Sequence, residues 1–188
     1  MAEMVDTNSF KNGMHIELDG KVWRILEFQH VKPGKGGAFV RTKLKNVRTG
    51  AVIDRTFRAD EKVVLAMIDK REMQFLYREG ADYVFMDNEN YDQLHVPSDS
   101  IGDAINFLKE GDSAVLPMYK DEIVGVELPA AVELVVTETE PGMQGDRVSG
   151  ARKAATLETG LVVQVPLFVN IGDRVKVDTR SSDYLSRA

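Results

Sequence analysis

Hydrophobic and polar residues alternate with a period of two along most of the chain, a pattern typical of strands that bury one face. The clearest example is the stretch FVRTKLKNV, residues 39–47. Its uncharged positions are Val40, Thr42 and Leu44, and its cationic positions are Arg41, Lys43 and Lys45. This stretch is therefore predicted to be a strand with a core side and a cationic side.

Turn residues separate such runs. In IELDGKVWRIL, residues 16–26, Asp19-Gly20 stands between two strand-like runs, which is the strongest short-range hairpin signal. Trp23 alternates with Ile25 and is expected in the core. A second long alternation has Leu161, Val163, Val165, Leu167 and Val169 on one face. It ends at Gly172-Asp173, a predicted turn.

One segment, SDSIGDAINFLKEG (residues 98–111), has helical spacing instead. Its apolar positions are Ile101, Ile105 and Leu108. Ser100 with Asp103 is a candidate capping pair, and Gly111 a candidate end.

These elements predict an all-β protein with three small domains, at residues 1–65, 66–128 and 129–188. About five short strands in each domain favour small barrels of the SH3-like or oligonucleotide-binding (OB) type. Closed barrels expose few strand edges, so a monomer is expected.

The composition, 43% hydrophobic over 188 residues, is that of a globular protein. There is no cysteine, which excludes disulfides and thiolate metal sites. No apolar run approaches the roughly 18–20 residues that span a bilayer, and the first residues lack the layout of a signal peptide. We therefore expect a cytoplasmic protein without membrane contact.

Charge is uneven along the chain, whose net charge is −6. Residues 1–65 hold 12 Lys and Arg against 8 Asp and Glu (+4), and residues 66–128 hold 5 against 14 (−9). From Phe28 to Ile53 there are six basic residues and no acid. Such a segment indicates a surface for a polyanion such as RNA. An ordinary solvated strand face is an equal alternative.

Lys35 is the only long side chain among Pro33, Gly34, Gly36 and Gly37. Proline fixes φ and glycine accepts unusual turn dihedrals, so this stretch predicts a narrow hairpin tip. GKGG here precedes a strand and lacks the spacing of a phosphate-binding loop. A plain solvated turn lysine is the alternative interpretation.

The sequence has no HExxH, GxSxG or Ser/His/Asp arrangement, and its three histidines are scattered singly. We therefore expect no catalytic residue, no metal and no cofactor. Residues 140–160 are rich in glycine and carry Asp146, Arg147, Arg152 and Lys153. They predict a long surface loop that is either functional or a flexible connection.

Several motifs together resemble bacterial elongation factor P over essentially the whole chain. They are HVKPGKGG followed by FVRTKLKNV, YVFMDNENYDQ, GDRVSG with KAATLETG, and VQVPLFVNIGDRVKVDTRSSDYLSRA. The resemblance implies an SH3-like (KOW-like) first domain and two OB domains in an L-shaped arrangement similar to transfer RNA. It also implies a translation factor that binds the 70S ribosome between the peptidyl and exit sites.

By the same resemblance, Lys35 reaches the acceptor end of peptidyl-tRNA and is a candidate for modification by a dedicated enzyme. Stalling at consecutive prolines is relieved in this way. Ribosomal RNA and messenger RNA in the exit site are further implied partners. Lys32, Arg41, Lys43 and Lys45 are expected to contact RNA phosphates, and Gly145, Asp146 and Arg147 to approach the messenger RNA.

Three alternatives stay open. One is the elongation factor P-like paralogue. Another is a general RNA-binding β-barrel protein that acts away from the peptidyl-transferase centre, for which Lys35 would be dispensable. The third is an enzyme, which the missing motifs disfavour.

Overall fold

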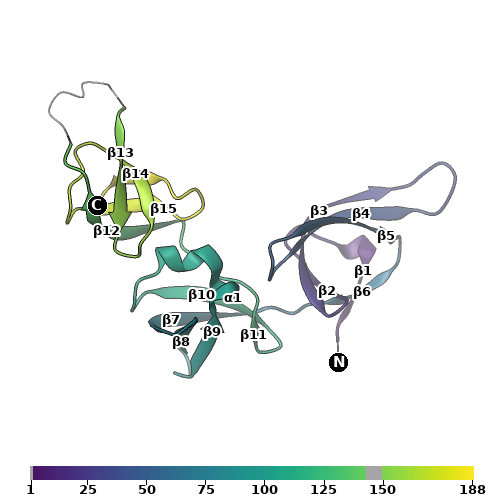
Figure 1. Cartoon of the computed structure of the whole chain (residues 1–188). Helices are drawn as coiled ribbons and strands as arrows, with labels where there is room; N and C mark the ends of the chain where they lie inside the picture. Colours follow the sequence, from purple (N-terminus) through teal and green to yellow (C-terminus); the bar gives the residue numbers. More distant parts are fainter. Residues whose placement is uncertain (1, 143–149) are drawn as a thin grey trace. The chain divides into compact units, whose positions relative to one another are not determined.

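The computed structural model describes residues 2–142 and 150–188, and they form three β-sheets (Figure 1). The prediction of an all-β fold is confirmed. In the described ranges no helix has the length and apolar character needed to cross a membrane.

The first sheet has six strands. In spatial order they are β1 (Met4–Asp6), β6 (Lys62–Leu65), β2 (His15–Leu18), β3 (Lys21–Val31), β4 (Phe39–Asn46) and β5 (Val52–Arg58). A short 3-10 turn, η1 (Thr7–Ser9), follows β1. The sheet surrounds a core of Phe10, Ile16, Ile25, Val40, Leu44, Phe57 and Val63.

Local sequence determines this sheet closely. Asp19 and Gly20 have φ of 52° and 73°, as the turn between two hairpin strands requires, so the predicted hairpin is confirmed. The alternation in β4 is also confirmed, because residues 40, 42 and 44 are buried and residues 41, 43 and 45 are exposed. Trp23 is only half-buried, packed against the edge of the core.

The other two sheets have five strands each. The second contains, in spatial order, β11 (Glu122–Ile123), β10 (Ser113–Tyr119), β7 (Asp69–Glu79), β8 (Asp82–Asp87) and β9 (Gln93–Pro97). The third contains β14 (Val162–Pro166), β13 (Arg152–Leu157), β12 (Ala131–Thr139), β15 (Arg174–Asp178) and β16 (Tyr184–Arg187).

The predicted helix is shorter and begins earlier than the spacing indicated. α1 (Ser98–Ile101) starts directly after Pro97, so Ser100 lies inside it, and the predicted capping pair with Asp103 is wrong. Gly102 has φ of 57°, and its N–H donates to the carbonyl of Ser98, which ends the α-helix after one turn. The chain then continues as a 3-10 helix, η2 (Gly102–Phe107).

Two further sequence expectations change in the third sheet. The alternation predicted for residues 161–169 is interrupted, because β14 ends at Pro166 and the N–H of Val169 donates to the Pro166 carbonyl in a turn. Val163, Val165 and Val169 are nevertheless all buried. The loop predicted for residues 140–160 is shorter, since β13 begins at Arg152.

Packing groups the chain into two compact units. The first comprises residues 1–70 and 117–125, and the second comprises residues 71–116 and 126–188. Within the second unit, Phe107 of η2 packs into the core of the third sheet, and the Thr159 hydroxyl donates to the carbonyl of Asn106 at 2.6 Å. The domain limits near residues 65 and 128 stay predictions.

Candidate functional site

The arm formed by β3 and β4 extends from the first sheet to a narrow loop (Figure 1). Strand pairing continues out to Val31 and Phe39, so residues 32–38 form the end of the arm, called here the Lys35 tip. Residues 32–37 are all exposed. The structure thus places Lys35 where the sequence predicted it, at the end of a hairpin.

The Lys35 tip is slim because little surrounds its backbone. Gly36 has φ of 103°, a conformation that other residues rarely adopt. A Cβ built at Gly34, Gly36 or Gly37 would meet nothing within 4 Å. Lys35 forms no ion pair or hydrogen bond with any residue that the structure describes. Its ammonium group is therefore available to a partner.

The predicted cationic residues of β4 are not equivalent. Lys43 pairs across the sheet with Glu27 on one side and Asp54 on the other, and its ammonium lies 3.8 Å from the Glu27 carboxylate. Arg41 pairs with the uncharged residues Gln29 and Thr56. Lys43 is partly neutralised, whereas Arg41 is not.

The outward face contains a further cation that sequence reasoning missed. Arg24 of β3 pairs directly with Lys45 of β4, so both side chains lie on the same face. Only the register of the β3–β4 pair shows this, and it includes an irregularity between Ile25 and Glu27. We call Arg24, Arg41, Lys43 and Lys45 the cationic face. Lys32, the fourth predicted RNA contact, lies in the Lys35 tip.

The third predicted site lies largely outside the described residues. Gly145, Asp146 and Arg147 are not among the residues that the structure describes. Of the neighbouring cations, Arg152 is exposed, and Lys153 donates from its ammonium group to the carbonyl of Glu140. Both belong to β13 rather than to a loop.

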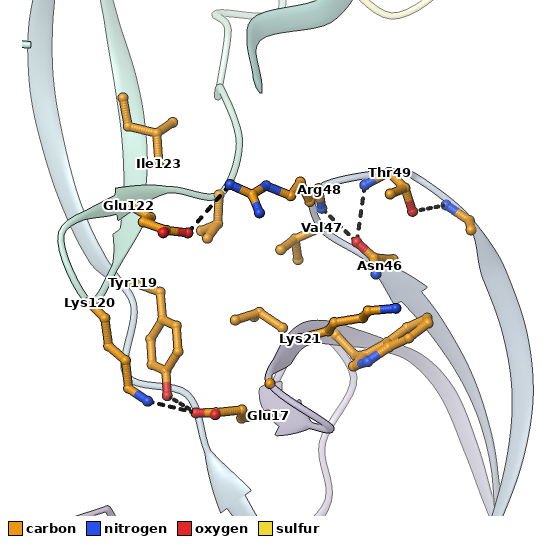
Figure 2. Close-up of a pocket in the computed structure, with 15 residues that line it drawn as sticks. Glu17, Lys21, Asn46, Val47, Arg48, Thr49, Tyr119, Lys120, Glu122 and Ile123 are labelled. Atoms are coloured by element: carbon orange, nitrogen blue, oxygen red, sulfur yellow. Dashed lines mark hydrogen bonds and ion pairs between the residues drawn. The ribbon is translucent and has the colours of Figure 1, made fainter. Parts of the chain in front are cut away.

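The first unit contains a second lysine-bearing turn, residues 119–122, called here the Lys120 turn. Lys120 and Asp121 have φ of 50° and 63°, both in the left-handed region although neither is glycine. The Lys120 ammonium lies 3.1 Å from the Glu17 carboxylate, which also accepts a hydrogen bond from the Tyr119 hydroxyl. Figure 2 shows these three side chains meeting at one side of a cavity.

The hydrogen bonds that Tyr119 and Lys120 donate hold the pKa of Glu17 below its usual value, and the bond from Tyr119 has the larger effect. The same contacts raise the pKa of Tyr119 and that of Lys120. On the other side of the cavity, the Arg48 guanidinium lies 3.5 Å from Glu122 (Figure 2). The cavity has a volume of about 450 Å³.

The described part of the chain holds no group of three or more His, Cys, Asp or Glu side chains arranged to bind a metal ion.

Three family models match successive parts of the chain. They describe the elongation factor P KOW-like domain (residues 6–63), the elongation factor P OB domain (residues 68–126) and the elongation factor P C-terminal region (residues 132–187). The KOW-like and OB character inferred by resemblance is thereby confirmed.

Relatives aligned over nearly their full length carry the same family name as these models. Elongation factor P of Acidothermus cellulolyticus is 60% identical over 185 residues, covering 98% of this chain and 99% of the relative. Elongation factor P of Streptomyces avermitilis is also 60% identical over 185 residues, covering 98% of each chain.

Among solved structures, a protein described as eukaryotic translation initiation factor 5A from Methanococcus jannaschii is 28% identical. It aligns with a TM-score of 0.55 over 66% of this chain and 89% of its own. An initiation factor 5A family protein from Naegleria fowleri, 15% identical, has the same TM-score over 68% of this chain and 99% of its own, which supports the fold alone. The three successive models and the full-length relatives together show that this chain belongs to the elongation factor P family.

Proposed function

We propose that this translation factor binds the 70S ribosome between the peptidyl and exit sites and places Lys35 beside the acceptor end of peptidyl-tRNA. The observation that carries the proposal is the Lys35 tip, a slim exposed loop with one long cationic side chain that no described residue engages. A loop of this width fits a crowded reaction centre, and an ammonium group can donate charge-assisted hydrogen bonds to tRNA.

The factor would act by positioning substrates. Proline restricts the approach of donor and acceptor, and correct orientation of two reactants can lower a barrier by several kcal/mol. Such a role requires no catalytic group or cofactor of its own. Relief of stalling at consecutive prolines follows, because proline is a poor donor and a poor acceptor. A covalent extension of Lys35 by a modifying enzyme would lengthen this reach.

The cationic face would hold RNA phosphates behind the Lys35 tip. Phosphate contacts fix position without reading sequence, and their affinity falls as salt rises. Arg41 is expected to contribute more than Lys43, because Glu27 and Asp54 flank Lys43. Lys32 would contribute at the tip itself. We further propose that Gly145, Asp146 and Arg147 approach messenger RNA in the exit site, that the protein is a cytoplasmic monomer, and that ribosomal RNA is a direct partner.

The test is reconstituted translation of a message that encodes consecutive prolines, with no factor, with this protein, and with Lys35→Ala. Rescue by the protein and its loss in Lys35→Ala are expected. Lys11→Ala, which changes another exposed lysine, is the matched control and should keep full rescue. Protein from its native cell and unmodified protein are compared, since a required modification would restrict rescue to the former.

The cationic face also supports a second candidate, a general RNA-binding β-barrel protein that acts away from the reaction centre. In that case Lys35→Ala would bind ribosomes and function normally, while removal of Arg41 and Lys45 would abolish both. The full-length relatives named elongation factor P favour the first candidate over this one and over the elongation factor P-like paralogue.

A further inference from the structure

The cavity of the first unit is large enough for one small organic molecule. Its volume is about 450 Å³, within the range of typical ligand pockets. One wall comes from the Lys120 turn and the residues that follow it, and the opposite wall from the ends of β2, β3 and β4 (Figure 2). Its larger apolar lining residues are Val22, Trp23, Val47, Ile123 and Val124.

Most charged groups of the lining are already engaged. Glu17 accepts from Tyr119 and Lys120, and Glu122 pairs with Arg48. Lys21 is the charged lining residue that has no ion-pair partner among the described residues. The cavity therefore offers one unpaired positive charge beside an apolar surface.

Asn46 supplies a second hydrogen-bond donor. The residue as a whole is 6% exposed, and its Oδ1 accepts from the N–H of Arg48 at 2.9 Å and of Thr49 at 3.0 Å. Because a backbone N–H can only donate, the atom that faces these two groups must be the oxygen. The orientation of the amide is thereby fixed, and Nδ2 points away from the turn.

The Asn46 Nδ2 group has no hydrogen-bond partner among the described residues. Figure 2 shows this nitrogen directed toward Lys21, which also lines the cavity. Among the described residues no fully buried side-chain nitrogen or oxygen lacks a partner, so Nδ2 is reached by solvent, and an acceptor that enters the cavity can bind it. An acceptor placed here would also lie beside the Lys21 ammonium.

We propose that this cavity binds a small organic carboxylate with an apolar, preferably aromatic, body. Its carboxylate accepts hydrogen bonds from Asn46 Nδ2 and the Lys21 ammonium, and its body packs against Trp23 and Ile123. The net lining charge favours an anion, since Lys21, Arg48 and Lys120 outnumber Glu17 and Glu122. This site goes beyond the proposed function, because it uses no residue of the Lys35 tip and requires no ribosome.

Trp23 is the only tryptophan of the chain, so tryptophan fluorescence of the full-length protein reports on the cavity. The probe is 3-phenylpropionate, and the matched control is its uncharged amide, 3-phenylpropionamide. We expect a saturable fluorescence change with a Kd of about 1 mM for a ligand of this size. The amide should bind at least about fivefold more weakly, because it lacks the charge that Lys21 and Asn46 recognise.

Two variants test the donors separately. Asn46→Asp keeps the oxygen that Arg48 and Thr49 use but replaces the amide donor with a negative charge, so the Kd should rise about tenfold or more. Lys21→Gln should raise it about fivefold, with less risk to folding because Lys21 is exposed. Lys62→Gln changes an exposed lysine outside the cavity and should leave the Kd unchanged. A urea unfolding midpoint shows that each variant is folded.

The proposal is overturned by any of three results. One is the absence of a saturable change with 3-phenylpropionate. Another is equal affinity for the amide, which would mean unspecific apolar association. The third is an unchanged Kd in Lys21→Gln and in folded Asn46→Asp.

Discussion

Two hairpin turns of the first unit each present a lysine, and they hold it in opposite ways. At the Lys35 tip, glycines form the turn, no described residue packs against them, and the lysine is unpaired among the same residues. At the Lys120 turn, no glycine is present, two residues have positive φ, and the lysine is bound to Glu17.

The difference shows how a turn's composition relates to its role. A left-handed conformation at a non-glycine residue costs about 1–2 kcal/mol and persists only where the surroundings compensate for it. At the Lys120 turn the compensation comes from Glu17, Tyr119 and the Arg48–Glu122 pair. The Lys35 tip lacks such contacts, and glycine makes them unnecessary. One lysine therefore serves the fold, and the other is free to serve a partner.

The largest expected effect comes from replacing the lysine of each turn with alanine. Lys35→Ala should reduce rescue of a consecutive-proline message by tenfold or more, because about 1.4 kcal/mol of lost positioning already changes a rate tenfold. Lys120→Ala should keep rescue and instead lower the urea midpoint of the first unit. Equal loss of rescue in both variants would contradict the division of roles.

A second prediction concerns the cations behind the Lys35 tip. Arg41→Ser with Lys45→Ser should weaken ribosome binding about tenfold at physiological salt and reduce the dependence of log Kd on log salt. Lys43→Ser alone should change binding little, because Glu27 and Asp54 already flank it. Sedimentation of ribosomes at several salt concentrations measures both. If Lys43→Ser weakens ribosome binding more than the double variant does, pairing with acidic neighbours does not determine how much each cation contributes to binding.

Introducing a glycine into the Lys120 turn and removing one from the Lys35 tip should affect stability and activity separately. Asp121→Gly relieves a positive φ and should raise the free energy of unfolding by about 0.5–1 kcal/mol, with normal translation activity. Gly36→Ala introduces strain at φ of 103° in a loop without packing contacts. It should change the unfolding free energy little and lower proline rescue, since the tip must take another shape. Urea unfolding and the translation assay separate the two outcomes.

The smallest expected effect is a dependence of stability on pH. Hydrogen bonds from Tyr119 and Lys120 lower the pKa of folded Glu17, so its contribution is present above its unfolded pKa of about 4.3 and is lost as pH falls through the folded value. The raised pKa values of Tyr119 and Lys120 imply a loss at the alkaline end, beginning near pH 10.

Urea midpoints followed by Trp23 fluorescence at pH 7 and pH 3.5 measure the acidic side in the first unit. Glu17→Gln should have a smaller difference between these midpoints than the unchanged protein, whereas the exposed-site control Glu3→Gln should match it. An identical pH dependence in Glu17→Gln would show that this carboxylate does not contribute.

Sequence predicted those parts of the fold that depend on neighbouring residues. The Asp19-Gly20 turn and the two faces of β4 follow from local backbone preferences and a period of two. The helix predicted at residues 98–111 was too long, because Gly102 has a positive φ and ends the α-helix after one turn. A glycine at this position of the sequence already indicated that the helix could end there.

Of the candidate functional site, the Lys35 tip could be predicted from the sequence, but contacts that depend on distant residues or on strand register could not. Lys35 was found because proline and glycine indicate a tip whatever the rest of the chain does. The Glu17–Tyr119 contact joins residues 102 positions apart, and neither residue type suggests the other. Arg24 was missed because its position beside Lys45 depends on strand register. The Asn46 donor could not be inferred, since it results from how the β4–β5 turn uses the amide oxygen.

The position of Phe107 also limits how freely this chain can be divided. A phenyl ring contributed by η2 is part of the core of the third sheet, which also includes Leu134, Val136 and Leu157. A C-terminal fragment that begins at residue 129 would lack that ring and expose the apolar surface around it. Recombination that moved such a segment between proteins would therefore succeed only if η2 moved with it or the new neighbour supplied an equivalent ring. All strands of the third sheet come from one continuous segment of the chain, but its core also needs a residue from outside that segment.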